Sequence, residues 1–206
     1  PSCSISDKEG NRTLTGKRCD YDSTNDPSTI VGIARSNFTN ITYDKNGGAI
    51  HIINSGFNCD RVEFRNCSST TGGGGAIYIK NSKEQENNVT LSNLFFYECQ
   101  AIYGGAIFIY FDSEKNSNSI VKCVFVGNCV PLSNPNSDVL FGGSSIFLSS
   151  LNTVIIKCRF IDGTSGPAVK VCDISSIKGK SRLFGYLSKK QPRMNDNLIL
   201  VSQCSF

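Results

Sequence analysis

The chain has 206 residues, of which 39% are hydrophobic and 18% are charged, and its formal net charge is +4. This length indicates one folded domain, or at most two small ones. No run approaches the roughly 18 apolar residues of a membrane-spanning helix, so we expect no membrane insertion of this segment. The small net charge argues against a nucleic-acid partner. With one histidine, His51, the chain cannot build a multi-histidine metal site, and we expect no metal or other cofactor.

Residues 1–29 are expected to form an N-terminal cap or lead-in segment. They contain Cys3, Cys19 and a polar run that ends at Pro27. An open end of a stacked sheet exposes unpaired backbone groups, which proteins normally cover. The opposite end, with a strand at 198–201 followed by Phe206, has no similar polar cap. We expect it to meet further coils or a second subunit.

Two phrases alternate from residue 30 onward, which indicates an internal repeat. The first phrase is Gly-Gly-Ala-Ile at the start of a short strand. It occurs at 47–52, 74–79 and 104–109, with degenerate copies at 142–148 and 166–171. The second phrase is a short strand that ends near a phenylalanine. Its copies lie at 36–40, 62–67, 94–99, 123–128, 158–162 and 204–206.

Both phrases have the period-two pattern of β-strands, and no stretch has the pattern of a useful helix. We therefore expect an all-β fold over 30–206, a right-handed parallel β-helix (solenoid) with irregular loops and disulfides, whose coils stack on one another. The glycine pairs are expected at corners. The expected interior ladders are Ile50, Ile52, Ile77, Ile79, Ile107, Ile109, Ile146, Leu148, Val169 and Val171. The expected interior aromatic column is Phe64, Phe96, Phe125, Phe160 and Phe206.

Two sets of side chains are expected to point outward. The first is a row of His51, Tyr78, Phe108, Phe147 and Lys170, which could stack on sugars or receive a partner's apolar side chain. The alternative is a cross-strand stack that only stabilises the sheet. The second set is unusually apolar, and we expect a loop at 111–118 or 130–140, or another chain, to cover it. This second set is Phe95, Tyr97, Val124, Val126 and Ile161.

The segment 173–197 interrupts the repeat as a basic loop insertion. Only Asp173 and Asp196 oppose its six cations. A protruding loop of this kind could bind acidic glycans or an acidic protein surface, although a solvated excursion is the commoner meaning of such a run. The six cations are Lys178, Lys180, Arg182, Lys189, Lys190 and Arg193.

The ten cysteines indicate an oxidising compartment, because no zinc-type Cys-x-x-Cys pair accompanies them. Cys67 and Cys99 each stand three residues after a column phenylalanine, one coil apart. Adjacent coils lie about 4.8 Å apart, within the Cα separation that a disulfide tolerates. Cys67–Cys99 is therefore the best single pair, and Cys3–Cys19 is a second candidate.

Three further cysteines, Cys123, Cys158 and Cys204, each stand two residues before a column phenylalanine. They cannot pair completely among themselves. Cys123–Cys158 together with Cys172–Cys204 is one of several solutions, between which the sequence does not choose. The alternative for any of these residues is a free buried thiol that packs as a small hydrophobic group.

Five N-glycosylation sequons accompany the cysteines. Together with the even number of cysteines they favour an extracellular location, either secreted or at the cell surface. The acceptor asparagines are Asn11, Asn37, Asn40, Asn66 and Asn88.

The three Gly-Gly-Ala-Ile phrases and Phe125-Val-Gly-Asn128 carry a family resemblance. They resemble the repeat of chlamydial polymorphic outer-membrane proteins and of similar surface proteins in protists such as trichomonads, over roughly residues 30–206. The cysteines and sequons indicate a eukaryotic, protist-like secreted relative. Those families are surface-exposed adhesins or antigens built as β-helical stalks. The resemblance thus implies an adhesive role and transfers no catalytic residue.

The sequence therefore predicts a non-catalytic extracellular module of a surface or matrix glycoprotein, used for adhesion or as a stalk. Its partners would be other protein chains or cell-surface glycans, with self-association through the ends of the β-helix as a further possibility. One alternative is a structural protomer of an extracellular filament assembled by end-to-end stacking. Another is a polysaccharide-active enzyme, which needs converging carboxylates. The available acids scatter over different coil positions: Asp60, Glu63, Glu98, Asp112, Asp138, Asp162 and Asp173.

Overall fold

The computed structural model describes residues 12–15, 18–22, 24, 30–82, 87–111, 116–131, 144–149, 152–161, 168–172, 183–184 and 199–206. Every regular element in these residues is a β-strand. The expectation of an all-β fold is confirmed for this part of the chain. The same residues contain no apolar helix long enough to cross a membrane.

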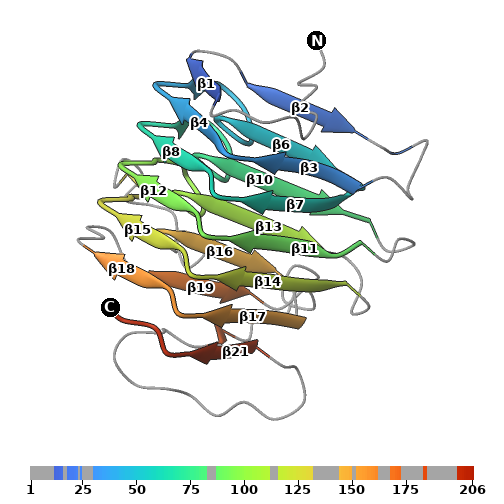
Figure 1. The fold of residues 1–206 in the computed structure, drawn as a ribbon, viewed down its shortest axis with the longest axis vertical. Helices are drawn as coiled ribbons and strands as arrows, with labels where there is room; N and C mark the ends of the chain where they lie inside the picture. Colours follow the sequence, from blue (N-terminus) through green and yellow to red (C-terminus); the bar gives the residue numbers. More distant parts are fainter. Residues whose placement is uncertain are drawn as a thin grey trace.

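Three parallel sheets, here called A, B and C, run along the molecule (Figure 1). Sheet A consists of β1 (Arg12–Thr15), β4 (Ser36–Thr39), β8 (Glu63–Arg65), β12 (Phe95–Tyr97), β15 (Val124–Val126) and β18 (Arg159–Ile161). Sheet B consists of β2 (Cys19–Asp22), β6 (Ile50–Ile53), β10 (Ile77–Asn81), β13 (Ile107–Phe111), β16 (Ile146–Ser149), β19 (Val169–Cys172) and β20 (Leu183–Phe184). Sheet C consists of β3 (Ile30–Ala34), β7 (Gly56–Asp60), β11 (Val89–Ser92), β14 (Ser117–Val121), β17 (Asn152–Ile156) and β21 (Ile199–Ser202). A short fourth sheet pairs β5 (Thr42–Tyr43) with β9 (Ser68–Ser69).

The chain visits sheets B, C and A in turn, and one such circuit is a coil. Each strand pairs in parallel with its counterparts in the neighbouring coils, as β10 does with β6 and β13. The exception is β20, which pairs antiparallel with β19. In the N-terminal segment, β1 and β2 pair in parallel with β4 and β6, so they extend sheets A and B by one strand each. The arrangement belongs to the β-helix- or solenoid-like class.

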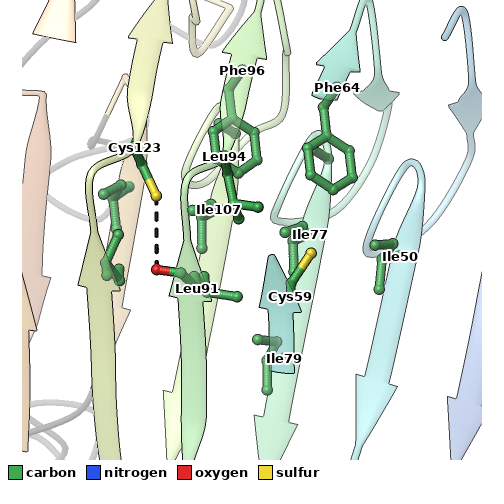
Figure 2. Packing of buried hydrophobic residues seen from close by; sticks show 14 of the residues in the cluster. Ile50, Cys59, Phe64, Ile77, Ile79, Leu91, Leu94, Phe96, Ile107 and Cys123 are labelled. Carbon is green, nitrogen blue, oxygen red and sulfur yellow. Dashed lines mark hydrogen bonds between the residues drawn. The ribbon is translucent and has the colours of Figure 1, made fainter. Parts of the chain in front are cut away.

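The interior of the coils is apolar, because alternate residues of each strand point inward. The expected isoleucine ladders lie inside: Ile50, Ile77, Ile107 and Ile146 are completely buried. They occupy one register position on four neighbouring strands of sheet B. Figure 2 shows three of them side by side, with Cys59 and Leu91 contributed by other strands of the core. The prediction of these ladders is confirmed for the described side chains.

The aromatic column is continuous. Consecutive rings of Phe64, Phe96, Phe125 and Phe160 stack with centroids 4.8–4.9 Å apart. Phe206 continues the stack at one end, at 5.1 Å, and Phe38 extends it at the other, at 5.2 Å. Phe38 belongs to the repeat but was not expected in the column. Because each ring covers a face of the next, the column fixes the coils in register.

The glycine pairs form the corners before sheet B, and the two glycines of a pair meet different requirements. The first, at Gly47, Gly74 and Gly104, has a positive φ of 56–70°, which favours glycine. The second approaches the backbone of the next coil. A Cβ on Gly75 would lie 2.1 Å from the Gly105 carbonyl oxygen.

Replacing Gly75 with alanine should therefore lower the free energy of unfolding by about 3 kcal/mol, or prevent folding, because backbone atoms must move. The matched control is Gly32→Ala on β3, where an added Cβ meets nothing within 4 Å. That variant should be as stable as the parent or slightly more stable. Urea unfolding followed by far-UV circular dichroism measures both. Equal losses in the two variants would contradict the stacked corner.

Candidate functional site

The outer face of sheet B carries the expected row of His51, Tyr78, Phe108 and Phe147. These residues are in register, and consecutive rings stack at 5.3, 4.9 and 4.9 Å. The row is less exposed than expected, however, because Tyr78 is 8% and Phe147 is 6% exposed. Burial also raises the pKa of Tyr78 to about 12. Lys170 follows Phe147 in register.

The corner segments before sheet B cover part of this row. Tyr103 packs edge-on against Phe108 and Phe147, with centroids 6.3 and 6.0 Å apart. Gly73 lies against Phe108 so closely that a Cβ would come within 2.7 Å of the ring. His51 and Phe108 are the half-exposed members. The row therefore has the geometry of a cross-strand stack that stabilises the sheet.

An ionic cluster lies at the N-terminal end of the same row. The Asp20 carboxylate lies 2.6 Å from Arg18 Nη2 and 2.9 Å from His51 Nδ1. The Arg18 guanidinium stacks 3.7 Å above the Tyr43 ring. Burial, together with the nearby Arg18 charge, lowers the pKa of His51, so the imidazole is mostly neutral at pH 7. This cluster was not predicted, because Arg18 and Asp20 lie in the segment expected to be a cap.

The outer face of sheet A carries the second apolar set. Phe95, Tyr97, Val124, Val126 and Ile161 are all half-exposed. Arg65 lies beside the two aromatic residues, 5.1 and 5.4 Å from their ring centroids, and it pairs with Glu63. Most of the two loops expected to cover this set, 111–118 and 130–140, lies outside the described residues, so covering by a loop or by another chain stays a prediction.

At the corner between sheets C and A, one residue per coil has a left-handed backbone conformation, with positive φ. This row was not predicted from the sequence. Each coil contributes one residue, with φ between 48° and 55°, and every side chain is exposed. In every coil except the last, the backbone N–H of this residue donates to a carbonyl one coil away, as Lys122 does to Ile156 at 2.9 Å. We call this set the basic corner row: Arg35, Arg61, Asn93, Lys122, Lys157 and Gln203.

The sequence does contain a signal for this row. Each member stands three residues before a phenylalanine of the aromatic column, from Arg35 before Phe38 to Gln203 before Phe206. Neither the apolar periodicity nor the glycine pairs indicate this position. Left-handed corners were expected at glycine, whereas arginine and lysine occupy four of these six positions.

Cys67 and Cys99, the best predicted disulfide pair, are free buried thiols. The Cys67 thiol donates to the Phe38 carbonyl at 3.6 Å, and the Cys99 thiol donates to the Phe64 carbonyl at 3.9 Å. In the next coil Asn128 Nδ2 donates to the Phe96 carbonyl at 3.3 Å. At this corner one side chain per coil, either cysteine or asparagine, thus donates a hydrogen bond to the backbone carbonyl of a column phenylalanine.

Cys123, Cys158 and Cys204 are also free thiols, so the expected Cys123–Cys158 pair is not formed either. Each thiol lies within hydrogen-bond distance of two backbone carbonyls; Cys123, for example, contacts those of Val121 and Leu91, the latter shown in Figure 2. The prediction was wrong because it considered Cα atoms alone. Parallel in-register strands keep Cβ atoms about as far apart as the strands, about 4.8 Å, whereas a disulfide needs about 3.5–4.5 Å.

The remaining disulfide candidates cannot be traced as pairs. Cys19 takes part in a disulfide bond; Cys3, its predicted partner, lies outside the described residues. The proposed Cys172–Cys204 pair is not formed, because Cys204 is a free thiol. Burial raises the pKa of the Cys59 and Cys99 thiols, which keeps both groups protonated at neutral pH.

Three of the five sequon asparagines, Asn40, Asn66 and Asn88, are exposed, and Asn37 is half-exposed. Asn40 and Asn66 stand at left-handed corners one coil apart, where Asn66 Nδ2 donates to Asn40 Oδ1 at 3.2 Å. Asn11 lies outside the described residues. So do the six cations of the basic loop, Lys178, Lys180, Arg182, Lys189, Lys190 and Arg193.

Two of the candidate acids among the described residues, Asp60 and Glu63, have different partners. Asp60 accepts hydrogen bonds from Arg61, Ser92 and Asn93 at 2.7–2.8 Å, and Glu63 pairs with Arg65. Among the residues that the structure describes, no group of three or more His, Cys, Asp or Glu side chains is placed to hold a metal ion. Asp112, Asp138, Asp162 and Asp173 lie outside those residues.

Comparisons of the chain with protein-family models, with curated proteins and with solved structures find no significant match. The strand register and the outer rows define the class of protein, an all-β chain of the β-helix- or solenoid-like type. Its function is inferred from these surfaces.

The role of Cys99 as a hydrogen-bond donor can be tested by substitution. Cys99→Asn should change the free energy of unfolding by less than about 1 kcal/mol, because Asn128 serves at the equivalent position. Cys99→Ala removes the donor and should cost about 1–3 kcal/mol. Urea denaturation without reductant measures both. A loss of about 2–5 kcal/mol in both variants would instead indicate a native disulfide.

Proposed function

We propose that the chain is a non-catalytic extracellular module of a surface or matrix glycoprotein, built as a right-handed parallel β-helix that acts as a stalk or an adhesive surface. The observation that carries the proposal is the in-register stacking of the coils. It places corresponding side chains in continuous rows along the outer faces, as in Phe95 and Val124 on sheet A. Such rows suit an extended partner, and solenoid proteins use surfaces of this kind for binding.

The right-handed winding is proposed on general grounds. Connections between parallel strands of one sheet are right-handed in nearly all proteins, because of the twist of the strands. Each strand of sheet B is followed by strands of sheets C and A before the chain returns to sheet B, so every coil is such a connection.

The extracellular location is supported by the position of the sequons. Asn40, Asn66 and Asn88 are exposed, which a glycan acceptor requires. The resemblance to surface adhesins of bacteria and protists supports the same location. Free thiols are compatible with it, because Cys67, Cys99 and Cys123 are buried in the core and therefore shielded from oxidants.

Expression through a eukaryotic secretory pathway should add glycans at Asn88 and at one or both of Asn40 and Asn66. The two corner asparagines lie one coil apart, so glycans on both would crowd each other. Asn88→Gln should therefore remove one glycan completely, whereas Asn40→Gln should raise the occupancy of Asn66. Intact mass before and after endoglycosidase treatment measures this. An unglycosylated secreted chain would contradict the proposed location.

The adhesive role is tested with beads that carry the folded chain. These beads should bind eukaryotic cells or extracellular matrix, and beads that carry Gly32→Ala should bind equally because that variant keeps the fold. Beads that carry Gly75→Ala should bind weakly, since the rows depend on the stacked corner. Failure of the folded chain to bind any cell or matrix surface would contradict adhesion.

A filament protomer is the second candidate, and one observation favours it. Phe206, the last ring of the column, is 43% exposed, whereas Phe160 is 7% exposed. At the other end Ile30 on β3 is 65% exposed, so both ends of the stack offer apolar surface to a second copy in head-to-tail contact. If the folded chain binds no surface but sediments as assemblies that grow with concentration, the filament protomer is the correct description.

A further inference from the structure

We propose that Lys122 and Lys157 of the basic corner row, together with the neighbouring Arg159, bind a linear acidic polysaccharide along the axis of the coils. This inference rests on the proposed function and names the chemistry of one adhesive partner. Lys122 and Lys157 lie on neighbouring coils, because Val121 and Ile156 before them are register partners. Arg159 follows two residues after Lys157, on the outer face of sheet A.

These three cations have no carboxylate partner among the described residues. The ion pairs found there involve Arg18, His51, Arg61 and Arg65. Earlier in the row Arg61 is neutralised by Asp60 at 2.7 Å. Arg35, at the first coil, also has no carboxylate partner among the described residues, but only Lys122, Lys157 and Arg159 gather on neighbouring coils, and all three are exposed.

Lysine and arginine are not the residue types that best suit a left-handed backbone conformation, so the fold by itself does not explain their presence in the row. Left-handed backbone is adopted most readily by glycine and asparagine. Three of the four left-handed positions in the corner after sheet A are asparagine or glycine (Asn40, Asn66 and Gly127), with Glu98 at the fourth, and the basic corner row uses Asn93 at one. Lysine at the next two positions adds backbone strain and places like charges about 4.8 Å apart. Strain that local structure does not require points to a function outside the fold.

The surroundings of the cations suit a sugar chain. Phe95, Val124 and Arg159 are register partners on three neighbouring strands of sheet A. Phe95 and Val124 are half-exposed, so an aromatic ring and an aliphatic side chain lie beside the guanidinium. Sugar rings pack their C–H faces on such apolar groups, while ammonium and guanidinium groups pair with carboxylate or sulfate.

A nucleic acid is the less suitable polyanion. Nucleic-acid-binding proteins commonly neutralise about 6–10 phosphates, whereas this segment offers three unpaired cations. The sequons also favour a partner that occurs outside cells. The shared chemistry of the ligand is a linear chain of sugars that bear carboxylate or sulfate groups, and the probes below distinguish the two.

The experiment uses the whole chain, immobilised, with three soluble probes: heparin, which is sulfated, polygalacturonate, which is carboxylated, and single-stranded DNA of matched length. The chain should bind at least one polysaccharide more tightly than the DNA. Binding should weaken as salt rises. The double variant Lys122→Asn/Lys157→Asn should bind that polysaccharide about tenfold more weakly, while its urea midpoint is unchanged or higher because asparagine suits the left-handed corner.

The control is Lys45→Gln/Lys80→Gln, which removes the same charge from two other exposed positions and should bind like the parent. Equal loss in both double variants would mean that net charge alone acts, and would overturn the proposal. Undiminished binding by Lys122→Asn/Lys157→Asn would also overturn it, since the segment 173–197 would then carry the affinity. Tighter binding of DNA than of either polysaccharide would overturn it as well. If no polysaccharide binds but the chain still adheres to cells, this inference fails and the proposed function stands.

Discussion

The fold depends on one constraint, the stacking of successive coils in register at the spacing of a parallel β-sheet. Each position in a coil lies directly over the same position in the coil below, so residues that share a position share an environment. This is why Phe96 stacks between Phe64 and Phe125, and why Gly75 must leave room for the Gly105 carbonyl. A slip of one residue in a strand would turn its apolar side chains outward. The loops between strands, by contrast, can change length freely.

The same constraint explains which parts of the structure the sequence could predict. The isoleucine ladders, the aromatic column and the glycine corners follow from the spacing of the repeat, because each needs only one residue type at a fixed position. The Cys67–Cys99 and Cys123–Cys158 pairs were predicted wrongly, because the direction of the Cβ atoms decides pairing and the spacing does not show it; these cysteines are the free buried thiols that the sequence left as the alternative. The aromatic row of sheet B was expected to be exposed, but Tyr103 and Gly73 come from a corner segment whose path the periodicity does not reveal.

The three corners of each coil have different residue types, which correspond to different roles. Before sheet B, glycines allow the closest approach of neighbouring coils. After sheet A, buried side chains such as Cys99 and Asn128 satisfy the carbonyls of the aromatic column. Between sheets C and A, exposed arginine and lysine occupy left-handed positions that they do not favour. The interior residue types follow from packing, whereas the basic corner row supplies exposed cations to the proposed polysaccharide site.

The central claim is that coils about 30 residues apart stack ring on ring through the aromatic column. The most direct measurement is a nuclear Overhauser spectrum of the chain with isotope-labelled phenylalanine and assigned rings. The account predicts cross-peaks between Phe64 and Phe96, between Phe96 and Phe125, and between Phe125 and Phe160, whose centroids lie 4.8–4.9 Å apart. It predicts none between Phe64 and Phe125, which Phe96 separates. Absence of the first three cross-peaks, or contacts that skip a coil, would contradict the stacked-coil structure.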